Sequence, residues 1–298
     1  AMLAERAGFK ALYVSGAGVA NASFGLPDLG FTTREQVAED VRRICAATPL
    51  PVLVDVDTGW DDPAETARVM IAAGAGAMQI EDQVDLKRCG HRPNKKLVST
   101  EEMVARVQAA VSGRTDPDFL VMARTDAVAG EGMAAAIARA RAYVAAGADL
   151  IFAEALRSLD EFKAFAAAVP VPLLANITEF GKTPLFTTRE LGEAGVGMVL
   201  YPLSAFRAMN AAALKVYETI RCDGSQGAVV EAMQTRDALY EVLRYHEYER
   251  RADEQRGSAK ETLGIFSALV SRLGIGGLKW EMEGLALRYL VPTVYKQS

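Results

Sequence analysis

The chain has 298 residues, of which half are hydrophobic and about a quarter charged, and its formal net charge is −5. This profile is typical of a soluble globular protein with one large domain or two small ones. A mildly acidic chain lacks the basic face that nucleic acid requires, and no apolar run is long enough to cross a membrane. The N-terminus shows no signal-peptide pattern. Three widely spaced cysteines (Cys45, Cys89 and Cys222) favour a reducing compartment, and we expect the cytoplasm.

Short apolar runs rich in β-branched residues alternate with alanine-rich helical stretches. Buried strands connected by helices form a parallel sheet that is covered on both faces. Seven such units favour a (β/α)8 TIM-type barrel over an open sheet, and no GxGxxG follows a strand to support a dinucleotide-binding fold. We expect the barrel over 1–220 and a C-terminal helical region over 221–298. The predicted strands lie at 11–15, 51–57, 77–82, 119–126, 151–156, 172–178 and 197–203.

Polar residues stand where most of these strands end. In a parallel barrel the carboxyl ends of all strands meet at one face, where active sites lie. Strand ends are also simply where polarity resumes, but carboxylates and an arginine within apolar runs would cost several kcal/mol if they were left unpaired. We therefore predict a functional face. Its residues are Ser15, Gly16, Asp55, Asp57, Glu81, Asp82, Arg124, Asp126, Glu154, Asn176 and Thr178.

The sequence also predicts a metal site at this face. Asp55 and Asp57 alternate with valines, so the period of a strand would direct both carboxylates to the same side. Two close carboxylates repel each other unless a cation lies between them, and Glu81 adds a further oxygen. Such a site suits Mg²⁺, or Mn²⁺ in its place, whereas zinc would need nitrogen or sulfur, which only Cys89 and His91 could supply. The alternative is a pair of structural aspartates that cap neighbouring helices.

The segment KRCGH places Lys87, Cys89 and His91 on a predicted loop after a strand end. Cationic neighbours lower the pKa of a thiol toward neutrality, which suits proton transfer. Covalent attack stays open, although no cysteine-protease signature surrounds the residue. A lone loop cysteine is more often incidental, and the nearby metal face is what favours a function here. The stretch Lys87–Lys96 is further predicted to be a gating loop.

Several motifs resemble those of the isocitrate lyase/phosphoenolpyruvate mutase superfamily. They are YVSGAGVANASFGLPDLG, LVDVDTGW, IEDQ, KRCGHRPNK, MARTDA, ANITEFGKTPLFTT and YPLSAFRAMN, and the resemblance covers about residues 1–250. KRCGH resembles the signature of the carbon–carbon lyases of the superfamily, which its mutases and oxaloacetate decarboxylases lack. The resemblance implies a Mg²⁺-dependent cleavage of the tricarboxylate (2S,3R)-2-methylisocitrate to pyruvate and succinate.

The resemblance also implies roles for the metal and acid residues. Asp55 and Asp57 would hold Mg²⁺, and Glu81 would reach it through water. Cys89 would protonate the succinate carbanion. Its neighbours Lys87 and His91 would adjust the pKa of its thiol and are also predicted to be catalytic residues.

The remaining site residues follow from the same resemblance. Tyr13 is the candidate base for the substrate hydroxyl, and the metal and a nearby arginine would have to lower its ordinary pKa of about 10. Asp28 is at a site position of the superfamily, although a turn or cap role explains it equally well. Backbone N–H groups at Ser15, Gly16 and Ala17 would hold one carboxylate. The other predicted substrate contacts are Gly90, Arg124, Glu154, Asn176, Ile177, Thr178, Arg207 and Arg236.

Two rival functions stay open at this point. One is a related lyase acting on isocitrate or 2,3-dimethylmalate, since selectivity for one methyl group is worth only about 1–3 kcal/mol. Phe180, Leu185 and Phe186 are candidate walls for that methyl group. The other rival is a non-catalytic barrel that binds or assembles partners, and the complete set of site residues argues against it.

The two ends of the chain depart from the family pattern. Family members begin with a helix and a strand that form the first barrel stave, and the residues from Ser258 onward exceed the usual family end. LVPTVY at 290–295 could fill the vacant stave, but Pro292 cannot donate in a strand ladder. We expect instead that the native first stave is absent from this sequence or that the terminus is altered. The C-terminal helices are expected to swap between subunits of a homotetramer, a dimer of dimers.

Overall fold

The computed structural model describes residues 1–84, 96–273 and 275–290, and the chain forms two units, Ala1–Ala228 and Val229–Ser298. All seven predicted strands are confirmed, each within a few residues of the predicted bounds. The strands are β1 (Leu12–Val14), β2 (Val52–Asp55), β3 (Ala77–Glu81), β4 (Leu120–Thr125), β5 (Leu150–Ala153), β6 (Leu173–Asn176) and β7 (Met198–Leu200).

Helices connect the strands of the first unit. Several begin at a serine, threonine or aspartate whose side chain accepts a hydrogen bond from the first turn, such as Thr33, Asp62 and Ser99. The helices are α1 (Met2–Arg6), α2 (Gly16–Ser23), α3 (Arg34–Ala47), α4 (Pro63–Ala72), α5 (Thr100–Ser112), α6 (Val128–Glu131), α7 (Met133–Ala145), α8 (Leu159–Ala168), α9 (Thr188–Glu193) and α10 (Ser204–Asp223).

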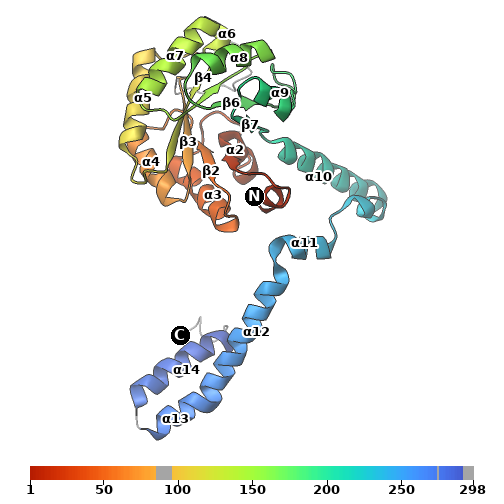
Figure 1. The fold of residues 1–298 in the computed structure, drawn as a ribbon. Coiled ribbons are helices and arrows are strands. Elements are labelled where there is room, and N and C mark those ends of the chain that lie inside the picture. The colour runs from red at the N-terminus through yellow and green to blue at the C-terminus, as the bar shows by residue number, and fades with distance from the viewer. Residues whose placement is uncertain (85–95, 274, 291–298) are drawn as a thin grey trace. The chain divides into compact units, whose positions relative to one another are not determined.

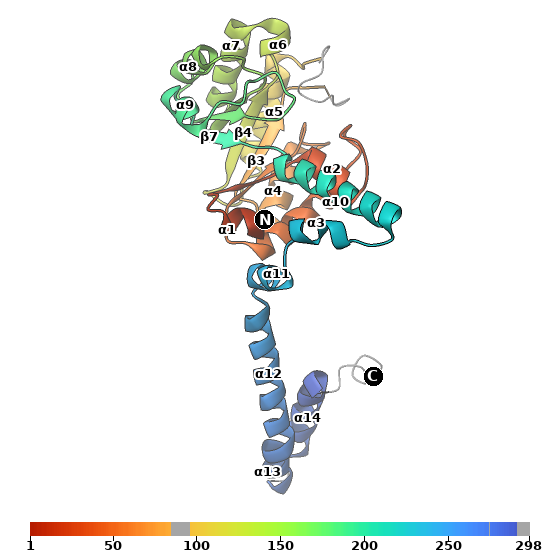
Figure 2. The same cartoon turned by 90° about the vertical axis from the view of Figure 1, so that its right-hand side faces the viewer.

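The seven strands pair in parallel and in chain order, which makes a barrel-like sheet. Helices α3, α4, α5, α7 and α8 cover its outer face (Figures 1 and 2), and the main apolar core lies between these helices and the sheet. A smaller apolar cluster consists of strand residues alone and therefore lies on the inner face. Its members, the inner cluster, are Leu53, Ala77, Met122, Leu150, Phe152 and Leu174.

The sheet does not close between its first and last strands. Within the described residues β1 pairs only with β2 and β7 only with β6, which agrees with the count of seven strands in the sequence. A cavity of about 780 Å³ lies at this seam, lined by residues of α1, β1, α2 and β7. The segment 290–295, the less favoured candidate for the vacant stave, lies outside the described residues except for Leu290, which ends a helix.

The second unit is helical. Its elements are η1 (Gly227–Ala232), which begins just before the unit, α11 (Arg236–Leu243), α12 (Tyr245–Glu261), η2 (Thr262–Phe266, a π-helix), α13 (Ser267–Arg272) and α14 (Gly276–Leu290). Helix α14 runs beside α12 (Figure 2). No helix in the described part of the chain is both long and apolar enough to cross a membrane.

Candidate active site

Arg124 is the centre of a buried cluster of charged side chains at the strand ends. Its Nη1 lies 3.3 Å from Glu81 Oε2 and its Nη2 lies 3.5 Å from Glu154 Oε2. Nε and Nη2 donate to the two carboxylate oxygens of Asp126 at 3.0 and 3.1 Å. Burial opposes the charge of the arginine, but the three carboxylates outweigh burial and raise its pKa, so the guanidinium stays charged. The structure thus brings together four of the predicted strand-end groups: Glu81, Arg124, Asp126 and Glu154.

The pairing register explains why these side chains meet. Glu81 stands opposite Arg124 in the β3–β4 ladder, and Arg124 stands opposite Phe152 in the β4–β5 ladder. Phe152 belongs to the inner cluster, so its opposite neighbours also face the barrel interior. The Arg124 guanidinium carbon lies 4.9 Å from the centre of the Phe152 ring, which adds a cation–π contact. Phe152 was not predicted as a site residue, although it begins the run FAEA.

Asp55 and Asp57 are linked by a hydrogen bond and not by strand alternation. Strand β2 ends at Asp55, whose carboxylate accepts from the backbone N–H groups of Gly16 and Asp57, both at 3.2 Å. Asp57 lies in a turn with a left-handed φ of 51°. The prediction that alternation directs both carboxylates to one side is therefore wrong in its reason, because Asp57 lies beyond the strand.

The three residues predicted to hold a substrate carboxylate lie at the start of helix α2. Ser15 caps this helix by accepting a hydrogen bond from Gly18 N–H at 3.4 Å, and Gly16 and Ala17 are its first residues. Backbone N–H groups at a helix N-terminus suit an anionic ligand. Here Gly16 N–H binds Asp55, which ties the helix start to the strand ends.

Tyr13, the candidate base, donates a hydrogen bond of 2.5 Å from its hydroxyl to Gln79 Oε1. Gln79 is completely buried in the middle of β3 and stands opposite Asp55 in the β2–β3 ladder. Its Nε2 has no hydrogen-bond partner within the described residues. Sequence reasoning missed Gln79. The available signal was a single polar residue inside the otherwise apolar run AMQI.

Asn176 joins the Arg124 cluster from β6. Its Nδ2 donates to Glu154 Oε2 at 3.2 Å, and its Oδ1 has no hydrogen-bond partner in the part of the chain that the structure describes. A buried amide oxygen without a partner is costly unless a ligand or water donates to it. Asn176 therefore fits the predicted role of a substrate contact.

The residues after β6 form a second polar group. Ile177 is buried, and its N–H donates to Leu200 O at 2.8 Å. Arg207 Nη1 donates to Thr178 Oγ1 at 3.3 Å and to Glu179 Oε2 at 3.0 Å. Hydrogen bonds from the Ser204 hydroxyl, then the backbone and Arg207, lower the pKa of Glu179. Arg207 thus touches the predicted contact Thr178 from helix α10.

The proposed methyl-binding walls do not gather at the strand ends. The side chain of Phe180 is 96% exposed, and Leu185 is 66% exposed. Phe186 packs edge-on against Phe162 of α8, with ring centres 6.4 Å apart. The apolar surface beside Arg124 comes from the inner cluster, through Phe152, and not from this loop.

Two other predicted site residues belong to different elements, and four lie outside the described residues. Asp28 is half-buried in the loop between α2 and α3, and Arg236 begins α11 in the second unit. Lys87, Cys89, Gly90 and His91 lie outside the described residues, as does all of the predicted gating loop except Lys96.

The donor set at the strand ends fits a hard divalent cation. Asp55, Asp57 and Glu81 offer carboxylate oxygens, which Mg²⁺ prefers. Within the described ranges no group of three or more His, Cys, Asp or Glu side chains is arranged to hold a metal ion. Oxygen donors of this kind fit a Mg²⁺ ion that takes water and substrate as further ligands.

Comparisons with known proteins identify the family of the chain. Residues 1–221 match the phosphoenolpyruvate phosphomutase family, and the chain belongs to it. The chain is 58% identical over 257 residues to the 2-methylisocitrate lyase of Shewanella oneidensis, which covers 85% of this chain and 88% of that protein. The solved structure of 2,3-dimethylmalate lyase, a PEP mutase/isocitrate lyase superfamily member, has 35% identity and a TM-score of 0.79 over 85% of this chain and 86% of its own. Phosphonopyruvate hydrolase, solved with oxalate and Mg²⁺, has 31% identity and a TM-score of 0.72 over 84% and 88%. The superfamily resemblance is confirmed.

Proposed function

We propose that the chain is a Mg²⁺-dependent carbon–carbon lyase that cleaves (2S,3R)-2-methylisocitrate to pyruvate and succinate. The observation that carries this proposal is the 58% identity to a 2-methylisocitrate lyase over 85% of the chain. The strand-end cluster supports it, because a tricarboxylate needs cationic and hydrogen-bonding partners at one place. Arg124 and the helix start at Gly16 supply such groups.

The reaction breaks the bond between the carbon that bears the hydroxyl and the carbon alpha to a carboxylate. A base takes the hydroxyl proton, the carbonyl of pyruvate forms, and the electrons of the broken bond pass to the succinate carbon. Tyr13 is the proposed base, and its hydrogen bond to Gln79 holds the phenol in place. Cys89 is the proposed donor of the proton that the succinate carbon accepts, with Lys87 and His91 beside it in sequence.

Mg²⁺, when bound, would stabilise the developing charge on the pyruvate oxygens. Asp55 and Asp57 would hold it directly and Glu81 through water. Arg124 would neutralise the substrate carboxylates, with Asn176, Thr178 and Arg207 as further contacts. Mn²⁺ is the proposed substitute for Mg²⁺.

An assay of pyruvate release tests the proposal. Purified protein with Mg²⁺ is offered 2-methylisocitrate, isocitrate and 2,3-dimethylmalate in parallel. We expect the highest kcat/KM for 2-methylisocitrate, by about 10-fold or more over isocitrate, because one buried methyl group is worth about 1–3 kcal/mol. A higher kcat/KM for 2,3-dimethylmalate would replace the proposed substrate with the alternative, and no release from any acid would reject the lyase.

We also propose that the protein works as a cytoplasmic homotetramer in which C-terminal helices swap between subunits, with the barrel over 1–220 and the helical region over 221–298. Exposed apolar side chains on helix α10 and on the helices of the second unit support contacts between subunits. On α10 these are Met209, Leu214, Tyr217 and Ile220, and in the second unit they include Ile265, Leu269, Leu278 and Trp280. Light scattering that gives the mass of one 32.0 kDa chain would contradict the tetramer.

A further inference from the structure

Two short stems, 82–84 and 96–98, flank the segment 85–95 that carries the KRCGH motif. Gln83 and Leu97 form an antiparallel bridge between the stems. Backbone hydrogen bonds of 3.0 and 3.1 Å join the stems on either side of this bridge. The points where the segment begins and ends are therefore fixed next to each other.

Helix α7 binds both stems through two buried side chains. The Tyr143 hydroxyl donates to Asp82 Oδ2 at 2.9 Å in the first stem. Arg139 Nη1 donates to Val98 O at 3.0 Å in the second stem and to the Tyr143 hydroxyl at 3.3 Å. The remaining guanidinium nitrogens of Arg139 bind the two carboxylate oxygens of Glu131, both at 2.7 Å. One arginine thus connects the two stems, directly on one side and through a tyrosine on the other.

The same network reaches the Arg124 cluster. Asp82 Oδ1 accepts a hydrogen bond of 2.9 Å from the backbone N–H of Asp126. Asp126 in turn accepts hydrogen bonds from Arg124 through both of its carboxylate oxygens. Asp82 and Tyr143 are completely buried, and Arg139 is 8% exposed. Hydrogen bonds between buried groups are strong and costly to lose, so this connection is rigid.

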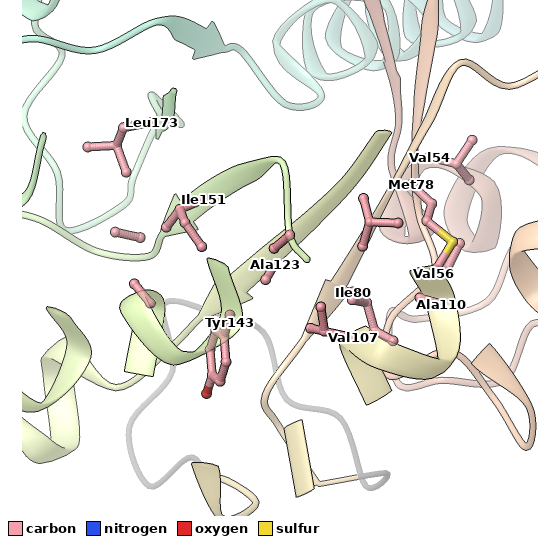
Figure 3. Close-up of a cluster of buried hydrophobic side chains, with 14 of the residues drawn as sticks. Val54, Val56, Met78, Ile80, Val107, Ala110, Ala123, Tyr143, Ile151 and Leu173 are labelled. Carbon is pink, nitrogen blue, oxygen red and sulfur yellow. The ribbon is translucent and has the colours of Figure 1, made fainter. Parts of the chain in front are cut away.

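The ring of Tyr143 is held by packing and its hydroxyl by polar contacts. Figure 3 shows the ring among buried apolar side chains that include Ala123 and Ile151, with the hydroxyl oxygen at the end of the ring away from them. Burial, followed by the nearby charge of Asp82, raises the pKa of the hydroxyl, so it remains a hydrogen-bond donor. Removal of the oxygen alone would therefore leave the ring in its place.

We propose that Arg139 and Tyr143 are positioning residues for the lyase reaction. They fix the two stems and so determine the two points between which the segment with Cys89 runs. They act through the stems and do not touch substrate. The inference rests on the proposed function, in which Cys89 is the proton donor.

The test compares Tyr143→Phe and Arg139→Lys with the control Arg141→Lys. Arg141 is on the same helix, but its Nε binds Ala168 O, away from the stems. For each variant kcat, KM, Tm and the rate of alkylation of Cys89 by iodoacetamide are measured, the last by mass spectrometry of the Cys89 peptide. Analysis of this peptide distinguishes alkylation of Cys89 from alkylation of Cys45 and Cys222.

We expect Tyr143→Phe and Arg139→Lys to lower kcat by about 10-fold or more, because small displacements of a reacting group are costly. KM should stay within about 3-fold, and the alkylation rate should change by about 5-fold or more, as a displaced proton donor requires. Arg141→Lys should leave all of these within about 2-fold.

Two outcomes would overturn the proposal. One is a folded Tyr143→Phe protein whose kcat and alkylation rate match the wild type. The other is a loss of kcat that only follows the loss of folded protein, with unchanged alkylation in the folded fraction. If the wild type cleaves none of the three acids, the proposed function falls instead, and the alkylation rates still decide whether the network positions Cys89.

Discussion

Arg124 shows how the inside of this barrel accommodates charge. An isolated buried charge is very costly, and here three carboxylates lie within 3.5 Å of one guanidinium. The strand-end pattern in the sequence predicted that such groups would meet, because unpaired charges within apolar runs would be unstable. The pairing partners could not be deduced, since they depend on the register between β3, β4 and β5.

Cys89→Ser is the direct test of the proton donor. Serine keeps the size of the side chain but holds its proton far more tightly, so kcat should fall by about 10²–10⁴-fold, the usual contribution of a positioned acid. Substrate and Mg²⁺ binding, measured by calorimetry, should change little. A variant that kept more than about a tenth of the wild-type kcat would exclude this role. Cys222→Ser, at an exposed cysteine, is the matched control.

Asp57→Asn tests the metal site without straining the backbone. Asp57 has a φ of 51°, a conformation that asparagine adopts as readily as aspartate, whereas alanine does not. Loss of its charge should weaken Mg²⁺ binding by about 10-fold or more in calorimetry. Asp61→Asn, at a side chain that is 85% exposed, should leave the affinity unchanged. Equal Mg²⁺ affinities for wild type and Asp57→Asn would remove Asp57 from the metal site.

At the scale of single elements, the helical periodicity of the sequence also identifies buried residues of α7. On α7 the residues Ala136, Arg139, Ala140 and Tyr143 follow the helical spacing and share the buried face. Arg139 and Tyr143 could thus have been assigned to the core from the sequence. Their contacts with the stems could not, because those stems lie far away in the chain. In the opposite sense, alternation was extended one step too far at Asp57, since nothing in LVDVDTGW shows that the strand ends at Asp55.

The contact between helices α4 and α5 gives a stability prediction. Gly113 caps the C-terminus of α5, and a Cβ there would lie 2.1 Å from the backbone oxygen of Ala64. Gly113→Ala should therefore destabilise the protein by about 1–3 kcal/mol in urea unfolding, as overpacking does. Gly192→Ala in α9, where a Cβ would meet nothing within 4 Å, should instead stabilise by about 0.5–1 kcal/mol. Equal unfolding midpoints for the two variants would contradict the close approach of α4 and α5.

For the whole molecule, the alternation of apolar strands and helices was sufficient to predict a parallel barrel-like sheet. Charged strand-end residues of β3, β4 and β5 meet in the structure, as the positions of polar residues in the sequence predicted. The seam between β1 and β7 was also expected from the count of seven strands. The inner contacts of Gln79 and Phe152 were missed, because they follow from which strand faces which and not from any motif.

We propose that this strand-end face cleaves a carbon–carbon bond with the help of Mg²⁺ and a protein proton donor. Proton NMR of one reaction of the purified protein with 2-methylisocitrate and Mg²⁺ in D₂O tests it most directly. We expect equal amounts of pyruvate and succinate, one solvent-derived deuterium in each succinate, and no reaction when EDTA is present in excess. Intact 2-methylisocitrate after prolonged incubation with Mg²⁺, or undiminished cleavage in EDTA, would contradict it.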